Sequence, residues 1–151
     1  MAATRQITID EFASLSLDGP WELVDGEIRP LNPTGGESGW VSGEIFGELW
    51  RFVHATRLGW VFGADTGFVL FPDKDTVRSP DAAVVLRDRL DRPPRGFVPL
   101  APDLAFEVLS PSDLMSEALG KVGMYLDAGA SSGSSPPTRE RSRSTGPMSP
   151  R

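Results

Sequence analysis

The chain has 151 residues, the length of one domain, and 39% of them are hydrophobic. It has no cysteine and one histidine, which excludes disulfides, thiol nucleophiles, thiolate metal sites and any zinc site built from several histidines. Residues 1–130 carry 11 Lys and Arg against 20 Asp and Glu, a balance that does not favour long-range attraction to nucleic acid. A metal site in this chain would use oxygen ligands, which favours Mg²⁺, Mn²⁺ or Ca²⁺.

The first 54 residues contain three predictable elements. Thr8 and Glu11 have the spacing of a capping box, which predicts a short helix directly after Thr8. The pair Asp25-Gly26 lies between two runs that contain apolar residues, and this pattern predicts a β-hairpin. Apolar residues recur at helical spacing from 37 to 54, so we expect an amphipathic helix there.

Strands and a last helix are predicted in the second half of the chain. The strand-like runs occupy residues 59–62, 67–71, 76–86 and 103–109. Residues 88–102 are polar and rich in proline, which is typical of a loop. A helix is expected to start at 111–113, with one apolar face formed by Leu114, Ala118, Val122 and Leu126.

The composition changes abruptly after Ala130. Residues 131–151 hold seven Ser, four Pro and four Arg, a composition that cannot bury enough apolar surface to fold. We therefore expect a domain at 1–130 and a disordered Ser/Pro/Arg-rich tail at 131–151. Two other interpretations are a basic arm that touches nucleic acid, and a reading frame that shifted near codon 131.

No apolar run reaches the roughly 20 residues of a membrane-spanning helix, and the N-terminus lacks the apolar segment of a secretory signal. We expect a cytoplasmic protein that does not enter a membrane. Trp40, Trp50 and Trp60 are expected to pack in the core or at an interface rather than to stack on bases. Exposed sheet edges and apolar helix residues would also allow a homodimer.

Two carboxylates fall within predicted core strands. Asp81 follows Pro80 in the run 76–86, and Glu107 lies among apolar residues in the run 103–109. A desolvated carboxylate costs several kcal/mol without a partner, so two of them on core strands suggest a shared divalent cation. Lys121, on the following helix, could then position a water or stabilise negative charge. In the alternative reading, Asp81 caps a turn, Glu107 pairs with an arginine and Lys121 is solvated.

The order of several segments resembles the Uma-type restriction endonuclease family, a branch of the PD-(D/E)XK nuclease superfamily. The resemblance covers most of residues 6–130. It rests on residues 21–27, 61–68, 77–83 and 101–113, and on Lys121 with 125–129. The Pro80-Asp81 pair, the stretch from Glu107 to Ser112 and the helix that carries Lys121 are together the most specific part.

The resemblance implies an α/β fold of the restriction-endonuclease type, with a mixed central sheet flanked by helices. It implies that Asp81 and Glu107 bind Mg²⁺ or Mn²⁺, that Lys121 is the catalytic lysine and that DNA is the substrate. The superfamily lysine normally follows the acid by two positions, which is Leu109 here, whereas Lys121 matches this family. A further acidic residue is also implied, and Glu44 and Glu22 are the candidates.

The chain departs from the family pattern at two places. Family members often carry a histidine where this chain has Ser38. They also continue after the Ala-Gly motif with an apolar strand, whereas Ala130 is followed here by Ser131-Ser132-Gly133, so we expect the last strand or strands of the sheet to be missing. An unpaired sheet edge would be exposed as a result.

Three functions remain open from the sequence. The first is a metal-dependent endonuclease that uses Asp81, Glu107 and Lys121, with Glu44 as the further acid. The second is an inactive truncated remnant or a non-enzymatic binding module of the same fold. The third is a dimeric DNA-binding protein that uses the arginines of the tail, and it predicts salt-sensitive binding that is lost without residues 131–151.

Overall fold

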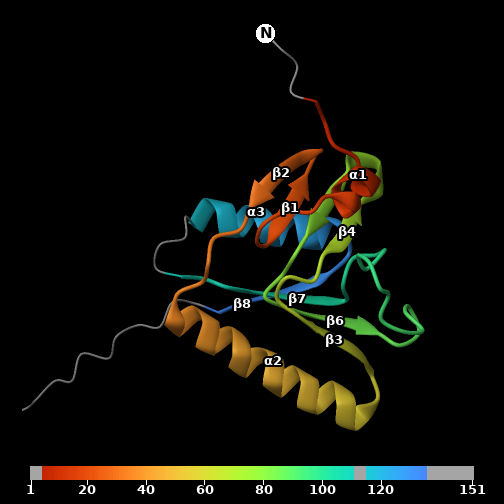
Figure 1. Cartoon of the computed structure of the whole chain (residues 1–151). Coiled ribbons are helices and arrows are strands. Elements are labelled where there is room, and N and C mark those ends of the chain that lie inside the picture. Colours follow the sequence, from red (N-terminus) through yellow and green to blue (C-terminus); the bar gives the residue numbers. More distant parts are fainter. Residues whose placement is uncertain (1–4, 111–114, 136–151) are drawn as a thin grey trace, which may run out of the picture.

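A computed structural model describes residues 5–110 and 115–135, the last five by their backbone alone. Two four-stranded sheets and three α-helices form the fold (Figure 1). In chain order the elements are α1 (Ile9–Ser14), β1 (Trp21–Val24), β2 (Glu27–Pro30), α2 (Gly36–Thr56), β3 (Gly59–Gly63), β4 (Phe68–Phe71), the short 3₁₀ helix η1 (Pro72–Lys74), β5 (Thr76–Arg78), β6 (Ala82–Leu86), β7 (Leu104–Val108), α3 (Met115–Asp127) and β8 (Ser131–Ser135).

The first sheet, which we call the N-terminal sheet, has the strand order β2-β1-β5-β4 with antiparallel pairs. The predicted hairpin is confirmed: β1 and β2 pair across a turn in which Asp25 has φ 49° and Gly26 has φ 76°. The predicted capping box of α1 is also present, because the Thr8 side chain accepts from Glu11 N and the Glu11 side chain accepts from Thr8 N.

The second sheet, which we call the central sheet, has the order β3-β6-β7-β8. The pairs β3–β6 and β6–β7 are antiparallel and β7–β8 is parallel, so the sheet is mixed as expected. Helix α2 contacts β3, β6 and β7, while α3 contacts β7 and β8 from the other side (Figure 1). The expected α/β class, with a mixed central sheet between helices, is therefore confirmed.

The single strand predicted at 76–86 is wrong, because the chain leaves one sheet and enters the other within it. β5 belongs to the N-terminal sheet and β6 to the central sheet, and Ser79, Pro80 and Asp81 connect them. Pro80 has no backbone N–H to donate to a strand ladder, which explains the break. Val77 and Val85, which a single alternating strand would place on one face with Asp81, therefore belong to different sheets.

Strand β8 occupies five positions that the sequence analysis assigned to the tail. Its backbone pairs with β7 from Leu104↔Ser131 to Val108↔Ser135. Residues 131–135 were expected to begin a disordered tail, but their backbone forms a strand of the central sheet. The family's apolar residues are absent from this strand, but its place beside β7 is filled. The rest of the expected tail, 136–151, lies outside the described residues.

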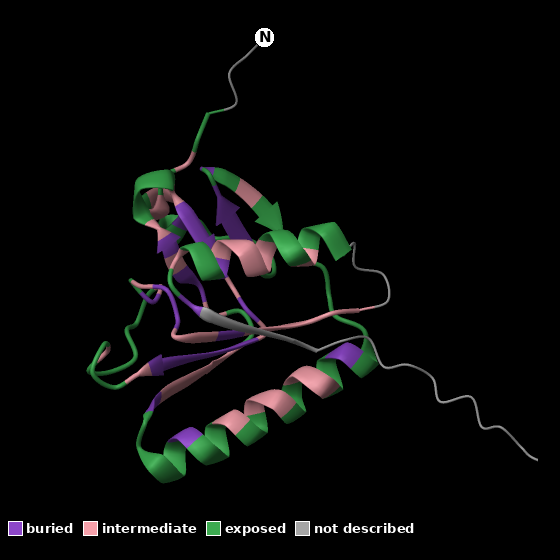
Figure 2. Ribbon diagram, turned by 180° about the vertical axis from the view of Figure 1, so that it is seen from behind, coloured by how far each residue is buried: buried purple, intermediate pink, exposed green. Residues whose placement is uncertain are grey.

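The two long helices, α2 and α3, bury and expose some side chains that the sequence pattern did not predict. α3 buries Tyr125 completely and exposes Leu126 to 52%, so the face predicted through Leu126 is wrong at that position. Helix α2 is amphipathic as predicted, with a half-buried inner face and an exposed outer face (Figure 2). Trp40 and Trp50 have 67% and 49% of their surface exposed, so neither packs in the core.

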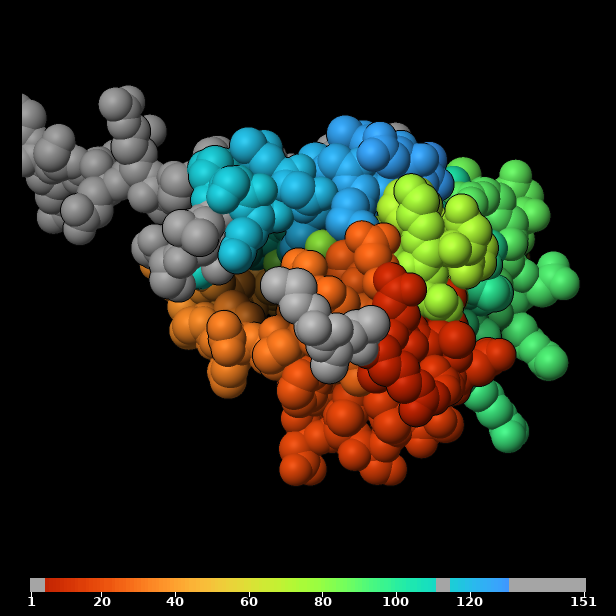
Figure 3. Space-filling view, turned by 90° about the horizontal axis from the view of Figure 1, so that it is seen from above, coloured from red at the N-terminus to blue at the C-terminus, as the bar shows by residue number. Residues whose placement is uncertain are grey.

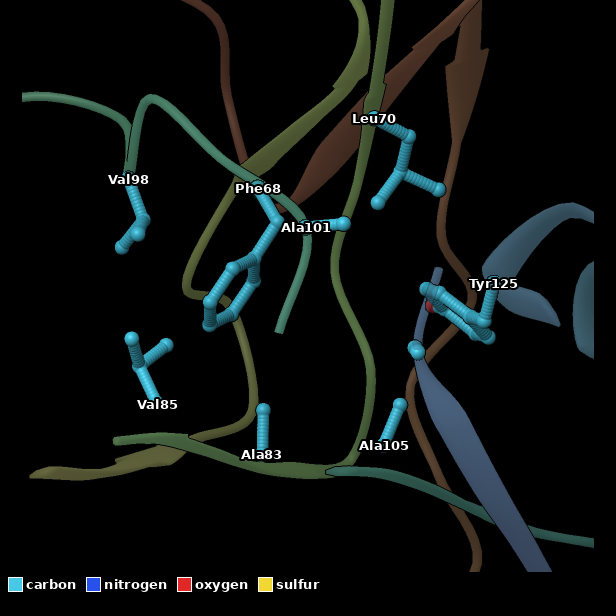
Figure 4. Packing of buried hydrophobic residues seen from close by; sticks show 9 residues of the cluster. Phe68, Leu70, Ala83, Val85, Val98, Ala101, Ala105 and Tyr125 are labelled. Atoms are coloured by element: carbon cyan, nitrogen blue, oxygen red, sulfur yellow. The ribbon is translucent and has the colours of Figure 1, made fainter. Parts of the chain in front are cut away.

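The main core lies between the two sheets. Side chains from β4, β6, β7, α3 and the 88–102 loop point toward one another there (Figure 4). Tyr125 from α3 closes one side of this cluster and is completely buried. The packing therefore fixes the position of the α3 turn that carries Lys121 relative to β7. Within the described ranges, no helix is long and apolar enough to cross a membrane.

Candidate active site

Asp81 and Glu107 lie on the same side of the central sheet. The β6–β7 register pairs Ala82 with Phe106, and one further step places Asp81 opposite Glu107. Residues directly opposite on antiparallel strands point to the same face. The backbone of Asp81 donates to Phe106 O at 3.0 Å, and its Oδ2 accepts from Val108 N at 2.6 Å. The geometric requirement for a site shared by these two carboxylates is therefore met.

A pocket of about 300 Å³ contains both carboxylates and Lys121. One wall comes from the end of the β1–β2 hairpin and the loop after it, and another comes from Glu117 and Ala118 of α3. Figure 3 shows α3 alongside the hairpin, in agreement with the contact between Lys121 and Glu22. Ala64 and Asp65, which follow β3, also line the pocket.

Lys121 is held between two carboxylates. Its Nζ lies 2.9 Å from Glu107 Oε1 and 3.4 Å from Glu22 Oε1, and its side chain is only 19% exposed. Burial lowers the pKa of Lys121, but attraction to Glu107 and Glu22 outweighs that effect and leaves the pKa above its usual value. Lys121 is thus a half-buried, positively charged group rather than a solvated helix residue.

Tyr125 contacts Glu107 from the next turn of α3. Its hydroxyl donates to Glu107 Oε1 at 2.8 Å. Burial raises the pKa of Glu107, and the charge of Asp81 raises it further, while Lys121 and Tyr125 partly compensate. Burial and the Glu107 charge raise the pKa of Tyr125 well above its usual value, so it remains a donor. Sequence reasoning missed this role, although Tyr125 follows Lys121 by one helical turn.

Glu22, one of the two acids considered as a further site residue, lies beside Lys121 and is buried. Its side chain is 2% exposed, and its Oε2 accepts from Arg78 Nη1 at 2.7 Å. Its Oε1 also accepts from Ser79 N at 2.8 Å. Glu44, the other candidate, is exposed on α2 and does not line the pocket. Arg78 was not predicted as a site residue, since nothing in the sequence shows which acid it meets.

The donors fit a divalent cation that prefers oxygen. Three carboxylates, Glu22, Asp81 and Glu107, lie close to two cationic side chains, Arg78 and Lys121. Within the described residues, no cluster of three or more His, Cys, Asp or Glu is arranged as a metal site. Mg²⁺ commonly needs one or two carboxylates and keeps its remaining ligands as water or phosphate oxygen, so Asp81 and Glu107 suffice.

Comparisons with known proteins agree with this fold. The family model Uma2, described as "Putative restriction endonuclease", matches residues 9–134. A crystal structure of "a putative nuclease belonging to DUF820" from Anabaena variabilis is similar, with a TM-score of 0.68 and 24% sequence identity over 82% of this chain and 70% of that chain. A comparison with curated proteins gives no significant match. The match over most of its length shows that this chain belongs to the Uma2 family.

Proposed function

We propose that this protein hydrolyses DNA phosphodiester bonds as an endonuclease that depends on Mg²⁺ or Mn²⁺. The observation that carries the proposal is the convergence of Asp81 and Glu107 in one pocket, with Lys121 Nζ 2.9 Å from Glu107. Membership of the Uma2 family supports the choice of nuclease chemistry.

Each side chain has a separate role in the proposed reaction. Asp81 and Glu107 would hold the cation, which when bound supplies charge stabilisation at the phosphate and lowers the pKa of a bound water. Lys121 would donate a hydrogen bond to the attacking water or to a phosphate oxygen that gains negative charge. The attacking water would give up one proton as its oxygen bonds to phosphorus, and the departing sugar oxygen would take up a proton as its bond to phosphorus breaks.

A cleavage assay on supercoiled plasmid and linear DNA tests this proposal. We expect cutting with Mg²⁺ or Mn²⁺, none in EDTA, and none by Asp81→Asn or Glu107→Gln. Circular dichroism should show that both variants keep the wild-type fold. Glu44→Gln is the matched control, because Glu44 is an exposed acid outside the pocket, and it should cut like the wild type. Activity that persists in both site variants would overturn the assignment.

A non-enzymatic module or an inactive remnant is the second candidate. It is favoured by the acidic balance of residues 1–130 and by the lack of a third acidic ligand among the described residues. A folded protein that binds neither Mg²⁺ nor Mn²⁺ in calorimetry would indicate the module. An unfolded circular dichroism spectrum would indicate the remnant.

A further inference from the structure

A second cleft lies at the opposite end of β6 from the carboxylates. It has a volume of about 540 Å³, and its walls include Trp50, His54, Arg57, Trp60 and Arg87. Asp81 precedes the first residue of β6 and Arg87 follows the last, so about 20 Å of extended chain separate them. This volume is in the range of small-ligand sites. We call it the arginine-tryptophan cleft.

The two arginines of this cleft have no acidic partner in the part of the chain that the structure describes. Arg57 and Arg87 are both exposed, and Arg87 Nε donates to Arg57 O at 3.2 Å. Asp88, the nearest acid in sequence, forms no ion pair with either of them within the same described ranges. Two adjacent cations without a counter-charge, in a domain with excess acid, favour binding of an anion.

Aromatic rings lie directly beside these charges. The Arg87 guanidinium lies 4.7 Å from the centroid of the Trp60 ring, and Trp50 stacks on His54 at 4.7 Å with 9° between the planes. Trp50 and His54 lie one helical turn apart near the end of α2, and Arg57 caps that end in the left-handed conformation with φ 52°. The Trp60 ring is fixed by a hydrogen bond from its Nε1 to Leu90 O at 2.8 Å.

We propose that the arginine-tryptophan cleft binds an unpaired stretch of DNA, with a base stacked on an indole and the adjacent phosphates on Arg57 and Arg87. Aromatic surfaces for bases next to cations for phosphates are the combination that single-stranded nucleic acid requires. An acidic peptide would use the cations but leave the indoles without a base. The choice of DNA rests on the proposed function, although binding at the cleft requires no cleavage.

Strand β3 connects the cleft with the candidate active site. β3 is an edge strand of the central sheet. Its first residues, Gly59 and Trp60, line the cleft, while Ala64 and Asp65, directly after its last residue, line the pocket with Asp81 and Glu107. A DNA strand held at the cleft can therefore follow this edge to the carboxylates. A fully stacked strand, at roughly 3.4 Å per nucleotide, would span this separation with about six nucleotides, and a more extended unpaired strand would need fewer.

The test is binding of a fluorescein-labelled 12-nucleotide single strand to the full chain in EDTA, followed by anisotropy. We expect the dissociation constant to rise about tenfold or more for Arg57→Ala/Arg87→Ala and about tenfold for Trp50→Ala. The affinity of the double arginine variant should also depend less on salt: the slope of log affinity against log salt concentration should become shallower by about 1.4, or about 0.7 for each lost phosphate contact. Arg51→Ala and Trp40→Ala are matched controls on the same helix, because Arg51 pairs with Glu48 and Trp40 lies outside the cleft. Both controls should bind within twofold of the wild type.

Three results would overturn the proposal. The first is equal loss of affinity in the cleft variants and the controls. The second is that the wild type binds a polyaspartate peptide or a blunt duplex as tightly as the single strand, and that Trp50→Ala does not change the dissociation constant for the single strand. The third is a concentration-dependent dimer, seen by light scattering, that covers Trp50 and excludes the oligonucleotide. The binding assay contains no metal, so its result is independent of the cleavage assay. If the protein cuts plasmid and Asp81→Asn abolishes cutting, the proposed function holds even when the cleft proposal fails.

Discussion

Lys121 Nζ and Glu107 Oε1 lie 2.9 Å apart, although the two residues come from different elements, α3 and β7. Glu22 contacts the same ammonium from β1 at 3.4 Å. The lysine is therefore held by both sheets at once. Its position depends on the packing of Tyr125, which fixes the adjacent turn of α3 in the core.

Removal of the Lys121 charge should impair catalysis more than DNA binding. For Lys121→Met we expect kcat to fall about 100-fold or more, since the loss of one preorganised donor commonly costs that much. The KM for DNA should change less than threefold. Steady-state cleavage of a short duplex, with active-site titration, measures both constants. A Lys121→Met enzyme with wild-type kcat would exclude the proposed role of the lysine.

Glu22 should matter for stability as well as for the position of Lys121. Glu22→Gln leaves the Arg78 guanidinium, which is 11% exposed, without its carboxylate partner. Breaking a buried pair from one side typically costs about 3–5 kcal/mol in the free energy of unfolding. Glu44→Gln changes an exposed acid and should cost less than about 0.5 kcal/mol. Urea denaturation followed by tryptophan fluorescence gives both values, and equal stability of the two variants would contradict a structural role for the pair.

The raised pKa of Glu107 predicts how stability depends on pH in the absence of metal. A carboxyl whose pKa is higher in the folded state than in the unfolded state stabilises the fold when protonated. This stabilisation is fully present at pH values below the pKa of Glu107 in the unfolded chain, near 4.5. It is lost as the pH rises through the higher pKa of Glu107 in the folded protein. The wild type should therefore lose stability relative to Glu107→Gln as pH rises. Urea denaturation of both proteins in EDTA across this range measures the difference, and a difference of the opposite sign would contradict the prediction.

Tyr125→Phe should raise the pKa of Glu107 still further, because the hydroxyl that donates to its Oε1 is removed. We expect the pH midpoint of Mn²⁺ binding to move upward in this variant. The ring remains in the core, so the free energy of unfolding should fall by only about 0.5–1.5 kcal/mol. Calorimetric Mn²⁺ titrations at several pH values measure the midpoint. An unchanged midpoint would show that Tyr125 acts in packing alone.

Gly59 lies where β3 packs against β6, and Gly47 on α2 serves as its control. A Cβ on Gly59 would lie 2.1 Å from Val85 O, so Gly59→Ala must move the backbone of the central sheet. A Cβ on Gly47 of α2 would meet nothing within 4 Å, and Gly47→Ala should stabilise the protein by about 0.5–1 kcal/mol. Thermal unfolding should show a lower Tm for Gly59→Ala and a higher Tm for Gly47→Ala. A Gly59→Ala protein as stable as the wild type would contradict this register.

Local signals were sufficient for several elements. The Thr8–Glu11 pair, the Asp25-Gly26 turn and the apolar period of α2 each act over a few residues, and the structure confirms all three. The sequence also suggested that Asp81 and Glu107 lie close together, and both line one pocket, although Asp81 is in the connection before β6 and not within a strand.

Other features depend on contacts between distant segments and could not be read from the sequence. The run 76–86 has one continuous strand pattern, yet Pro80 marks its transfer between two sheets. The partner of Glu22 is Arg78, 56 positions away, and no local pattern selects it. The backbone of β8 pairs with β7 although its residues are Ser and Gly, since ladder hydrogen bonds do not require apolar side chains.

Calorimetric titration of the metal-free protein with Mn²⁺ tests the central claim most directly. We predict saturable binding of Mn²⁺ to the wild type, with loss of that binding in both Asp81→Asn and Glu107→Gln while the fold is retained. Glu44→Gln should bind like the wild type, because its carboxylate lies outside the pocket. Wild-type protein that is folded but binds no Mn²⁺, or site variants that bind it unchanged, would contradict a shared cation at these two carboxylates.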